Sequence, residues 1–154
     1  MVKKASKKIW MLKRMKQLGL DEATLVHFWI MEGRCHLETA TAVWSGGITV
    51  QQSRDLERVQ RRALATITSW DQDYPGLCAR LGIQLLSERR CKLSLTFAKR
   101  TISKSRHKDI FVKLENPPQT RNGTKLWKDP KCRTRRHFMS AAPYLTRLRN
   151  EGDN

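Results

Sequence analysis

The sequence lacks an apolar run of about 18 residues, the length that a membrane-spanning helix needs. Its first residues, MVKKASKKIW, are basic but lead into no uninterrupted apolar segment of the kind found in signal peptides. We therefore expect neither a membrane span nor a signal peptide. The chain is interpreted as an intracellular protein of the nucleus or the cytoplasm.

Cysteine is scarce and scattered, with four residues and no C-x-x-C pair. This spacing favours neither a zinc ribbon nor a disulfide framework, so reduced thiols are expected. Cys132 and His137 have the spacing of half a zinc knuckle, but zinc takes four ligands and the other two are missing nearby. The sequence predicts no metal site and no cofactor.

Catalytic motifs are also missing. The sequence has no phosphate-binding glycine loop, no serine nucleophile elbow and no H-E-x-x-H. Asp71 and Asp73 form a D-x-D between two expected helices, where acids are common in turns, and no third carboxylate accompanies them. We expect no enzymatic activity from this chain by itself and assign no catalytic residue.

Acidic residues are few in relation to basic ones. The 14 Asp and Glu face 31 Lys and Arg, which gives a formal net charge of +17 over 154 residues. This charge is well above the magnitude of about 2–8 that suits a small soluble domain. Such an excess indicates a polyanionic partner, with nucleic acid as the first candidate and an anionic membrane as the second.

Helical periodicity recurs along the chain, whereas strand signals are weak everywhere. The sequence predicts an all-α fold, a small helical bundle followed by a basic and largely irregular C-terminal tail. The expected domains are a helical domain over 1–113 and a proline-containing tail over 114–154 with a short helix from near Pro143. The expected helices of the first domain are 2–18, 22–44, 50–68, a short one near 76–81, and one that begins at Ser87.

The first expected helix has a basic outer face. Ala5, Ile9, Leu12 and Met15 recur at helical spacing and form its apolar stripe. Lysines and arginines cover the rest of this helix, which contains no acid. The lysines that we assign to nucleic-acid binding are Lys3, Lys4, Lys7 and Lys8.

The helix over 50–68 contains LERVQRRALATI, in which apolar residues three or four apart form one stripe. Thr49 and Gln52 form a capping box at its start. Its arginines fall mostly on the side away from the stripe, and Glu57 is the one acid of this stretch within reach of them. The arginines assigned to nucleic-acid binding here are Arg58, Arg61 and Arg62.

The helix from Ser87 repeats this division, with Arg89 and Arg90 on its basic face. Its predicted apolar stripe consists of Cys91, Leu95, Ala98 and Ile102. Several helices with the same division predict a continuous cationic surface for a polyanion.

The segment 22–44 differs from these helices because it is rich in large apolar residues and acidic overall. We expect a central helix that is packed on several sides, in which Gly33 marks a kink or a close helix crossing. In the tail, Trp127 and Phe138 are candidates either for stacking on unpaired bases or for anchoring the tail to the helices.

Five segments in order resemble the C-terminal part of reverse transcriptases from non-LTR retrotransposons. They are VKKASKKIWMLKRMKQLGLDEATL, AVWSGGIT, LERVQRRALATI, LLSERRCKLSLTFAKR and KCRTRRHFMSAAPYLTRLRN. In that family the region follows the polymerase palm and holds the helical thumb and a basic extension. The resemblance implies that the chain is a thumb-region fragment of an RNA-directed DNA polymerase.

The resemblance also implies which residues bind. Arg58, Arg61 and Arg62 would lie where the family's thumb holds the RNA template and the new DNA strand. The tail arginines in RTRR, Arg133, Arg135 and Arg136, would contact the backbone or anchor the tail. The family's metal-binding aspartates lie upstream of the matched region, and this sequence contains no match to them or to an endonuclease domain.

Three interpretations follow, none of which has a membrane as the partner. In the first two the expected partner is RNA, DNA or an RNA/DNA hybrid. The chain is part of a reverse transcriptase, which would also contact a separate palm domain, or it is a non-functional remnant of one. Alternatively, it is a stand-alone, host-recruited basic helical protein that binds RNA or DNA. In the third, the apolar helix over 22–44 docks on another protein. An upstream palm in the neighbouring genomic sequence would favour the first.

Overall fold

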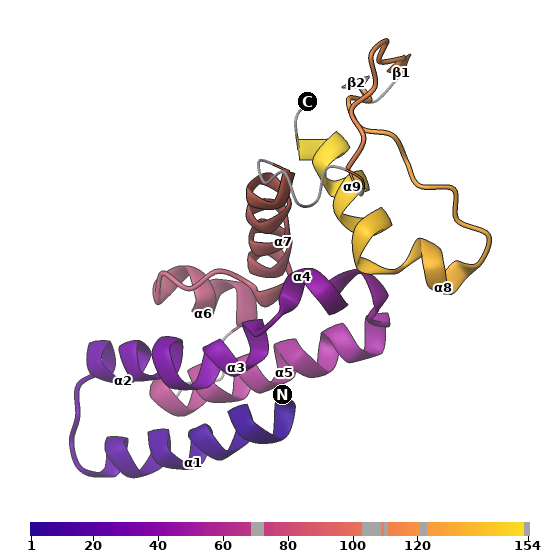
Figure 1. The fold of residues 1–154 in the computed structure, drawn as a ribbon. Helices are drawn as coiled ribbons and strands as arrows, with labels where there is room; N and C mark the ends of the chain where they lie inside the picture. Colours follow the sequence, from indigo (N-terminus) through magenta and orange to yellow (C-terminus); the bar gives the residue numbers. More distant parts are fainter. Residues whose placement is uncertain (69–72, 103–108, 110, 121–122, 153–154) are drawn as a thin grey trace. The chain divides into compact units, whose positions relative to one another are not determined.

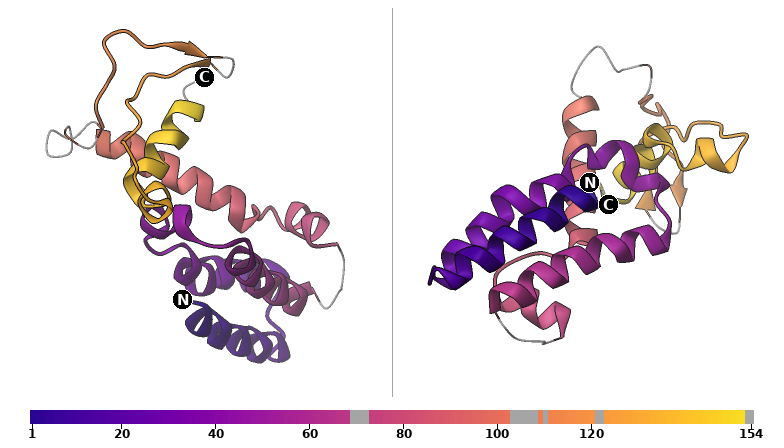
Figure 2. Two further views of the ribbon diagram at one scale, coloured as in Figure 1. Left: turned by 90° about the vertical axis from the view of Figure 1, so that its right-hand side faces the viewer. Right: turned by 90° about the horizontal axis from the view of Figure 1, so that it is seen from below.

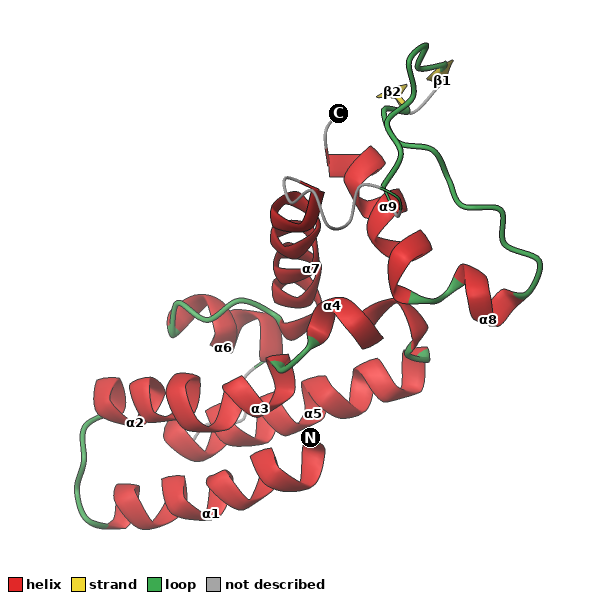
Figure 3. Cartoon of the chain, viewed as in Figure 1, coloured by secondary structure: helices red, strands yellow, loops and turns green. Residues whose placement is uncertain are grey.

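A computed structural model describes residues 1–68, 73–102, 109, 111–120 and 123–152. These residues are mostly helical, with one antiparallel pair of two-residue strands (Figure 3). The predicted all-α class is therefore confirmed. Within the described residues, no helix is both long and apolar enough to cross a membrane.

The chain divides into two compact units, each of which is described by itself. The first unit contains residues 1–39 and 49–89, and the second contains residues 40–48 and 90–154. These units differ from the expected division at residue 113. Residues 40–48 and residues 90–102, which form most of a long helix, belong with the C-terminal segments.

The first unit is built from five helical segments and a π-helical turn, and a further helix, α7, begins in it (Figure 1). In chain order they are α1 (Val2–Gln17), α2 (Glu22–Phe28), the π-helix η1 (Trp29–Arg34), α3 (Cys35–Glu38), α5 (Val50–Thr68), α6 (Tyr74–Arg80) and α7 (Leu86–Ile102).

Helix α1 ends where the sequence predicts. Gly19 has a φ of +84°, the left-handed conformation that glycine adopts without strain. The N–H of Gly19 donates to the carbonyl of Lys16, and the N–H of Leu20 donates to that of Met15. These two bonds form a Schellman motif, which satisfies the last carbonyls of the helix.

Helix α1 packs against α5 and η1 through Ala5, Ile9 and Leu12, which are all buried. In Figure 2 helix α1, in indigo, lies beside α5. Lys16 fixes the ends of α1 and α5 together, because its ammonium donates to the carbonyls of Thr66 at 2.9 Å and Ile67 at 2.6 Å. A cation at these last carbonyls also complements the dipole of α5.

The single helix expected over 22–44 is wrong in extent. It begins after Asp21, whose carboxylate accepts from the N–H of Thr24, but it widens into η1 at Trp29. It then breaks at Ala40, whose φ of +55° cannot continue a right-handed helix. A Cβ at Gly33 would overlap the buried ring of Trp29, one turn earlier in η1, so the contact that requires glycine here comes from its own helix and not from the expected crossing helix.

The second unit joins residues 40–48 to the C-terminal part of the chain. Its core contains Ala42, Ala98, Phe111 and Leu145, with Trp127 packed against them. The C-terminal region is thus partly folded, and the helix expected near Pro143 is confirmed within α9. Besides most of α7, the elements are α4 (Thr41–Trp44), the 3₁₀ turn η2 (Ser45–Gly47), β1 (Gln119–Thr120), β2 (Gly123–Thr124), α8 (Arg135–Phe138) and α9 (Ala141–Gly152).

The buried row of α7 differs from the predicted stripe. Leu86, Arg90, Ser94 and Ala98 are buried at intervals of four residues, whereas Cys91 is exposed. The row is rotated by about one residue from the predicted one and includes an arginine. A long side chain can take such a place because its aliphatic stem packs like an apolar residue.

Candidate nucleic-acid interface

Helix α5 separates an apolar face from a cationic one. Thr49 and Gln52 form the predicted capping box: the Gln52 N–H donates to Thr49 Oγ1 at 3.1 Å and the Thr49 N–H to Gln52 Oε1 at 2.9 Å. The helix therefore starts at a fixed residue, which determines the direction of every later side chain. Its apolar stripe is buried, and the three arginines assigned to binding, Arg58, Arg61 and Arg62, are all exposed.

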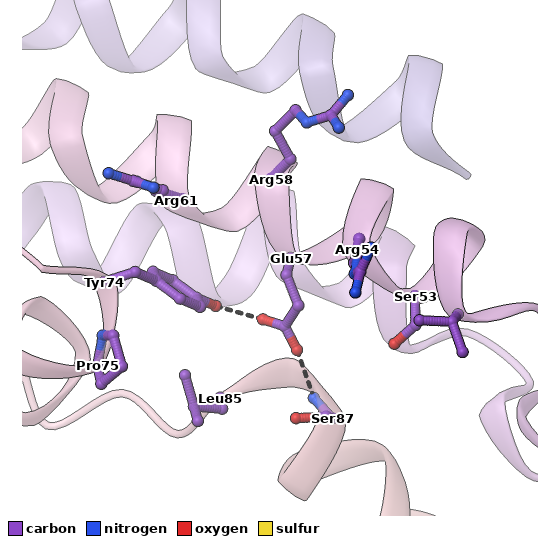
Figure 4. A pocket seen from close by; sticks show the side chains of 10 residues that line it. Ser53, Arg54, Glu57, Arg58, Arg61, Tyr74, Pro75, Leu85 and Ser87 are labelled. Atoms are coloured by element: carbon purple, nitrogen blue, oxygen red, sulfur yellow. Dashed lines mark hydrogen bonds between the residues drawn. The ribbon is translucent and has the colours of Figure 1, made fainter.

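The acid of this stretch, Glu57, serves another purpose than neutralising the arginines. Its carboxylate accepts from the Tyr74 hydroxyl at 2.5 Å and from the Ser87 N–H at 2.7 Å (Figure 4). It also accepts from the Leu86 N–H at 3.3 Å. The last two are backbone donors at the start of α7, where a negative charge is stabilised by the helix dipole. Glu57 is thus the cap of another helix.

The hydroxyl of Tyr74 is held as a donor. Burial, together with its hydrogen bond to the Glu57 carboxylate, raises the pKa of Tyr74. The amide of Gln60 donates to the same hydroxyl at 3.0 Å and to the carbonyl of Gln84 at 3.2 Å. This half-buried polar network joins α5, α6 and α7 within the first unit.

A groove of about 550 Å³ lies beside this network. Cations from α5 line it together with apolar side chains from α6 and from the segment before α7: Arg54, Arg58, Arg61, Tyr74, Pro75 and Leu85. In Figure 4 the side chain of Arg58 points away from the carboxylate of Glu57. The groove combines a cationic border with an apolar lining.

Arg58 has a carboxylate partner that the sequence interpretation overlooked. Its Nη1 lies 3.3 Å from Oδ1 of Asp55, one turn earlier in α5. Arg58 is exposed and Asp55 partly so, and an exposed pair of this kind contributes only about 0–1 kcal/mol. A phosphate can therefore compete for Arg58. Among the described residues, no carboxylate lies within ion-pair distance of Arg62.

The lysines of α1 are placed largely as predicted. Lys3, Lys4 and Lys7 are exposed, and no described carboxylate lies within ion-pair distance of them. Lys8 differs because its Nζ lies 2.7 Å from Oε2 of Glu32 in η1. This hydrogen bond lowers the pKa of the Glu32 carboxyl.

The assignment of Arg89 and Arg90 to an exposed basic face is wrong for Arg90 and incomplete for Arg89. Arg90 is 4% exposed and belongs to the buried row of α7. Arg89 is half-buried, and its Nε lies 3.4 Å from Oε1 of Glu38, which also binds Nε of buried Arg34 at 2.5 Å. Glu38 of α3 therefore contacts both Arg34 of η1 and Arg89 at the start of α7.

The tail arginines lie in the second unit. Arg133, Arg135 and Arg136 are exposed, and Thr134 caps α8 by accepting from the His137 N–H at 3.1 Å. A groove of about 640 Å³ is lined by Arg135 and Arg136 together with Trp44 of the same unit. The predicted exposed cations are thus divided between the two units, with those of α1 and α5 in the first and the tail arginines in the second.

The two tail aromatics are engaged within the second unit. The backbone N–H and carbonyl of Trp127 are both bonded to the Asn150 amide, at 3.0 and 3.1 Å, and the side chain packs against the core. The guanidinium of Arg147 lies 3.7 Å from the ring centroid of Phe138, which is 45% exposed. Of the two uses considered for Trp127, these contacts favour anchoring.

An aromatic that the sequence interpretation overlooked is Trp10 of α1, which is 68% exposed. A signal for it was available: Trp10 follows Lys7 by three residues and precedes Arg14 by four, so these residues share one helix face.

Other chemistry at the interface is limited. Among the described residues, no three His, Cys, Asp or Glu side chains lie close enough together to hold a metal ion. Asp73 precedes α6, and Asp71 of the D-x-D lies outside the described residues. The four cysteines, one buried, are free.

Comparison with known proteins gives no relative: no family model, curated protein or solved structure matches the chain.

Proposed function

We propose that the chain binds the phosphate backbone of RNA, DNA or an RNA/DNA hybrid, as the thumb and basic tail of a non-LTR retrotransposon reverse transcriptase would. In this proposal it holds template and primer and has no active site of its own. The family part rests on the five sequence segments, and the binding part rests on the placement of the cations.

The observation that carries the proposal is the outer face of α5. Arg58, Arg61 and Arg62 are exposed on it, while the adjacent acid, Glu57, caps α7 instead of pairing with them. The exposed guanidinium groups of this face suit a polyanionic partner.

The type of contact follows from the side chains. Guanidinium groups bind phosphate oxygens well because two parallel N–H donors match two oxygens. Such contacts position a duplex but carry no sequence information by themselves. A protein that holds a template through them binds duplexes of different sequence with similar affinity.

The salt dependence of binding tests the proposal. The protein should bind a 20-base-pair RNA/DNA hybrid with a steep negative slope of log K against log salt, and each lost phosphate contact should reduce the slope by about 0.9. Replacing Arg58, Arg61 and Arg62 together with alanine should therefore flatten it by up to about 2.7.

The matched control replaces the same three arginines with lysine, which keeps the charge and should keep most of the slope. An alanine variant with an unchanged slope would show that phosphates do not lie at these arginines. A wild-type protein that binds no nucleic acid at low salt would overturn the proposed function.

A further inference from the structure

The outer face of α1 carries one aromatic side chain among cations. Trp10 is 68% exposed, and its ring makes no part of the buried core of the first unit. At 100° per residue, Lys3, Lys7 and Arg14 fall within about 60° of Trp10 around the helix axis. All three are exposed, and they lie opposite the buried stripe of α1.

This arrangement is costly unless something covers it. A largely exposed indole leaves apolar area in contact with water, which is unfavourable. The neighbouring cations repel one another, and α1 contains no acid that would offset them. A partner that suits the face must bring both negative charge and a flat surface for the ring.

An anionic membrane suits this face poorly. A helix that lies in a membrane surface buries a broad apolar face among the lipid tails. The apolar stripe of α1, which contains Ala5, Ile9 and Leu12, already faces the core of the first unit. Trp10 is left as an apolar residue within a cationic face, which is too little for stable insertion.

A single nucleic-acid strand suits it well. Proteins that hold single strands combine a cationic surface along the backbone with aromatic rings on which bases stack. From Lys3 to Arg14 the helix rises by about 16 Å, which equals the length of about five stacked nucleotides.

We propose that Trp10 stacks on an unpaired base of a single strand whose phosphates lie along Lys3, Lys7 and Arg14. The proposal rests on the proposed function and adds to it a distinct contact for unpaired nucleotides. In a duplex the bases are already stacked on one another, so Trp10 should contribute little to duplex binding.

The test measures binding of a ten-nucleotide oligodeoxythymidylate, of an abasic strand of the same length, and of a blunt duplex. Trp10→Ala should weaken binding of the oligothymidylate by about 5- to 150-fold, the range for loss of one stacked base, and should change binding of the other two less than twofold. Trp10→Phe should restore most of the affinity because it keeps a ring.

The matched control is Leu18→Ala, which removes another exposed apolar side chain, 74% exposed, from the end of α1 without removing a ring. It should leave all three affinities unchanged. In addition, wild-type tryptophan fluorescence should be quenched by the oligothymidylate, and Trp10→Phe should lose that part of the quenching.

The outcomes separate this inference from the proposed function. The stacking contact is refuted if Trp10→Ala binds the oligothymidylate as tightly as wild type does, or if its affinity for the abasic strand falls by the same factor. Binding through α5 stands in either case. Binding to vesicles of anionic lipid that depends on Trp10 more than oligothymidylate binding does would also refute it. Failure to bind any of the three nucleic acids overturns both.

Discussion

The carboxylate of Glu57 accepts a hydrogen bond of 2.7 Å from the backbone N–H of Ser87, thirty residues later in the chain. Glu57 lies in α5 and Ser87 in the first turn of α7. The Glu57 side chain therefore caps the N-terminus of α7 and also joins the two helices. The same contact removes Glu57 from the arginines next to it in sequence.

Glu57→Ala should therefore be destabilising. It leaves the Tyr74 hydroxyl and two N–H groups of α7 without their acceptor, which should lower the free energy of unfolding by about 2–3 kcal/mol. Glu57→Gln should cost less because one acceptor oxygen remains. Urea denaturation measures both. Glu88→Ala, which removes an exposed acid from the first turn of α7, is the control and should cost about 0.5 kcal/mol. Equal losses would contradict the capping role.

Tyr74 should make the stability depend on alkaline pH. Its pKa is raised in the folded protein by burial and by the bond to Glu57, whereas an unfolded tyrosine titrates near 10. The stabilisation is therefore fully present below about pH 10 and is lost as the pH rises further, because only the unfolded chain releases the proton.

Lysines also titrate in this range, so the difference between two proteins is the informative quantity. Tyr74→Phe should be less stable than wild type at pH 8, and this difference should shrink between pH 9.5 and 11. Chemical denaturation at each pH measures it. A constant difference would show that Tyr74 ionises equally in the folded and unfolded states.

The features that could be predicted from the sequence are those that a few neighbouring residues determine. The end of α1 follows from Gly19 and the start of α5 from Thr49 and Gln52, because their hydrogen bonds close within one helical turn. The periodic spacing of apolar residues likewise located α1 and α5. Local rules of this kind need no knowledge of the rest of the chain.

The features that were wrong or overlooked depend on residues far apart in sequence. Arg90 is buried because other parts of the fold pack against its side of α7. Glu57 accepts from the Ser87 N–H because α7 begins beside it. The break at Ala40 separates segments that belong to different compact units. Periodicity alone predicts that an arginine is exposed. It also predicts that a long apolar segment forms one helix.

Two glycines should respond in opposite ways to the same substitution. Gly33→Ala places a Cβ against the ring of Trp29, which is fully buried, and should cost about 1–3 kcal/mol. Gly76→Ala is the control, because a Cβ in α6 meets nothing within 4 Å and should stabilise by about 0.4–1 kcal/mol. Thermal or urea denaturation gives both values. A neutral Gly33→Ala would mean that Trp29 can repack.

Asn150 should hold Trp127 in place. Its amide bonds to both the N–H and the carbonyl of Trp127, and the side chain is 6% exposed, so water cannot replace these bonds fully in the folded chain. Asn150→Ala should cost about 1–3 kcal/mol and speed hydrogen exchange at the Trp127 amide. The exposed Asn116, replaced by alanine, serves as the control in the same unit and should change neither. Because Asn150 lies in α9, faster exchange at Trp127 in the variant would also show that the C-terminal region is folded as part of the second unit. Equal exchange in variant and wild type would indicate that Asn150 does not anchor Trp127, which would then be available for other contacts.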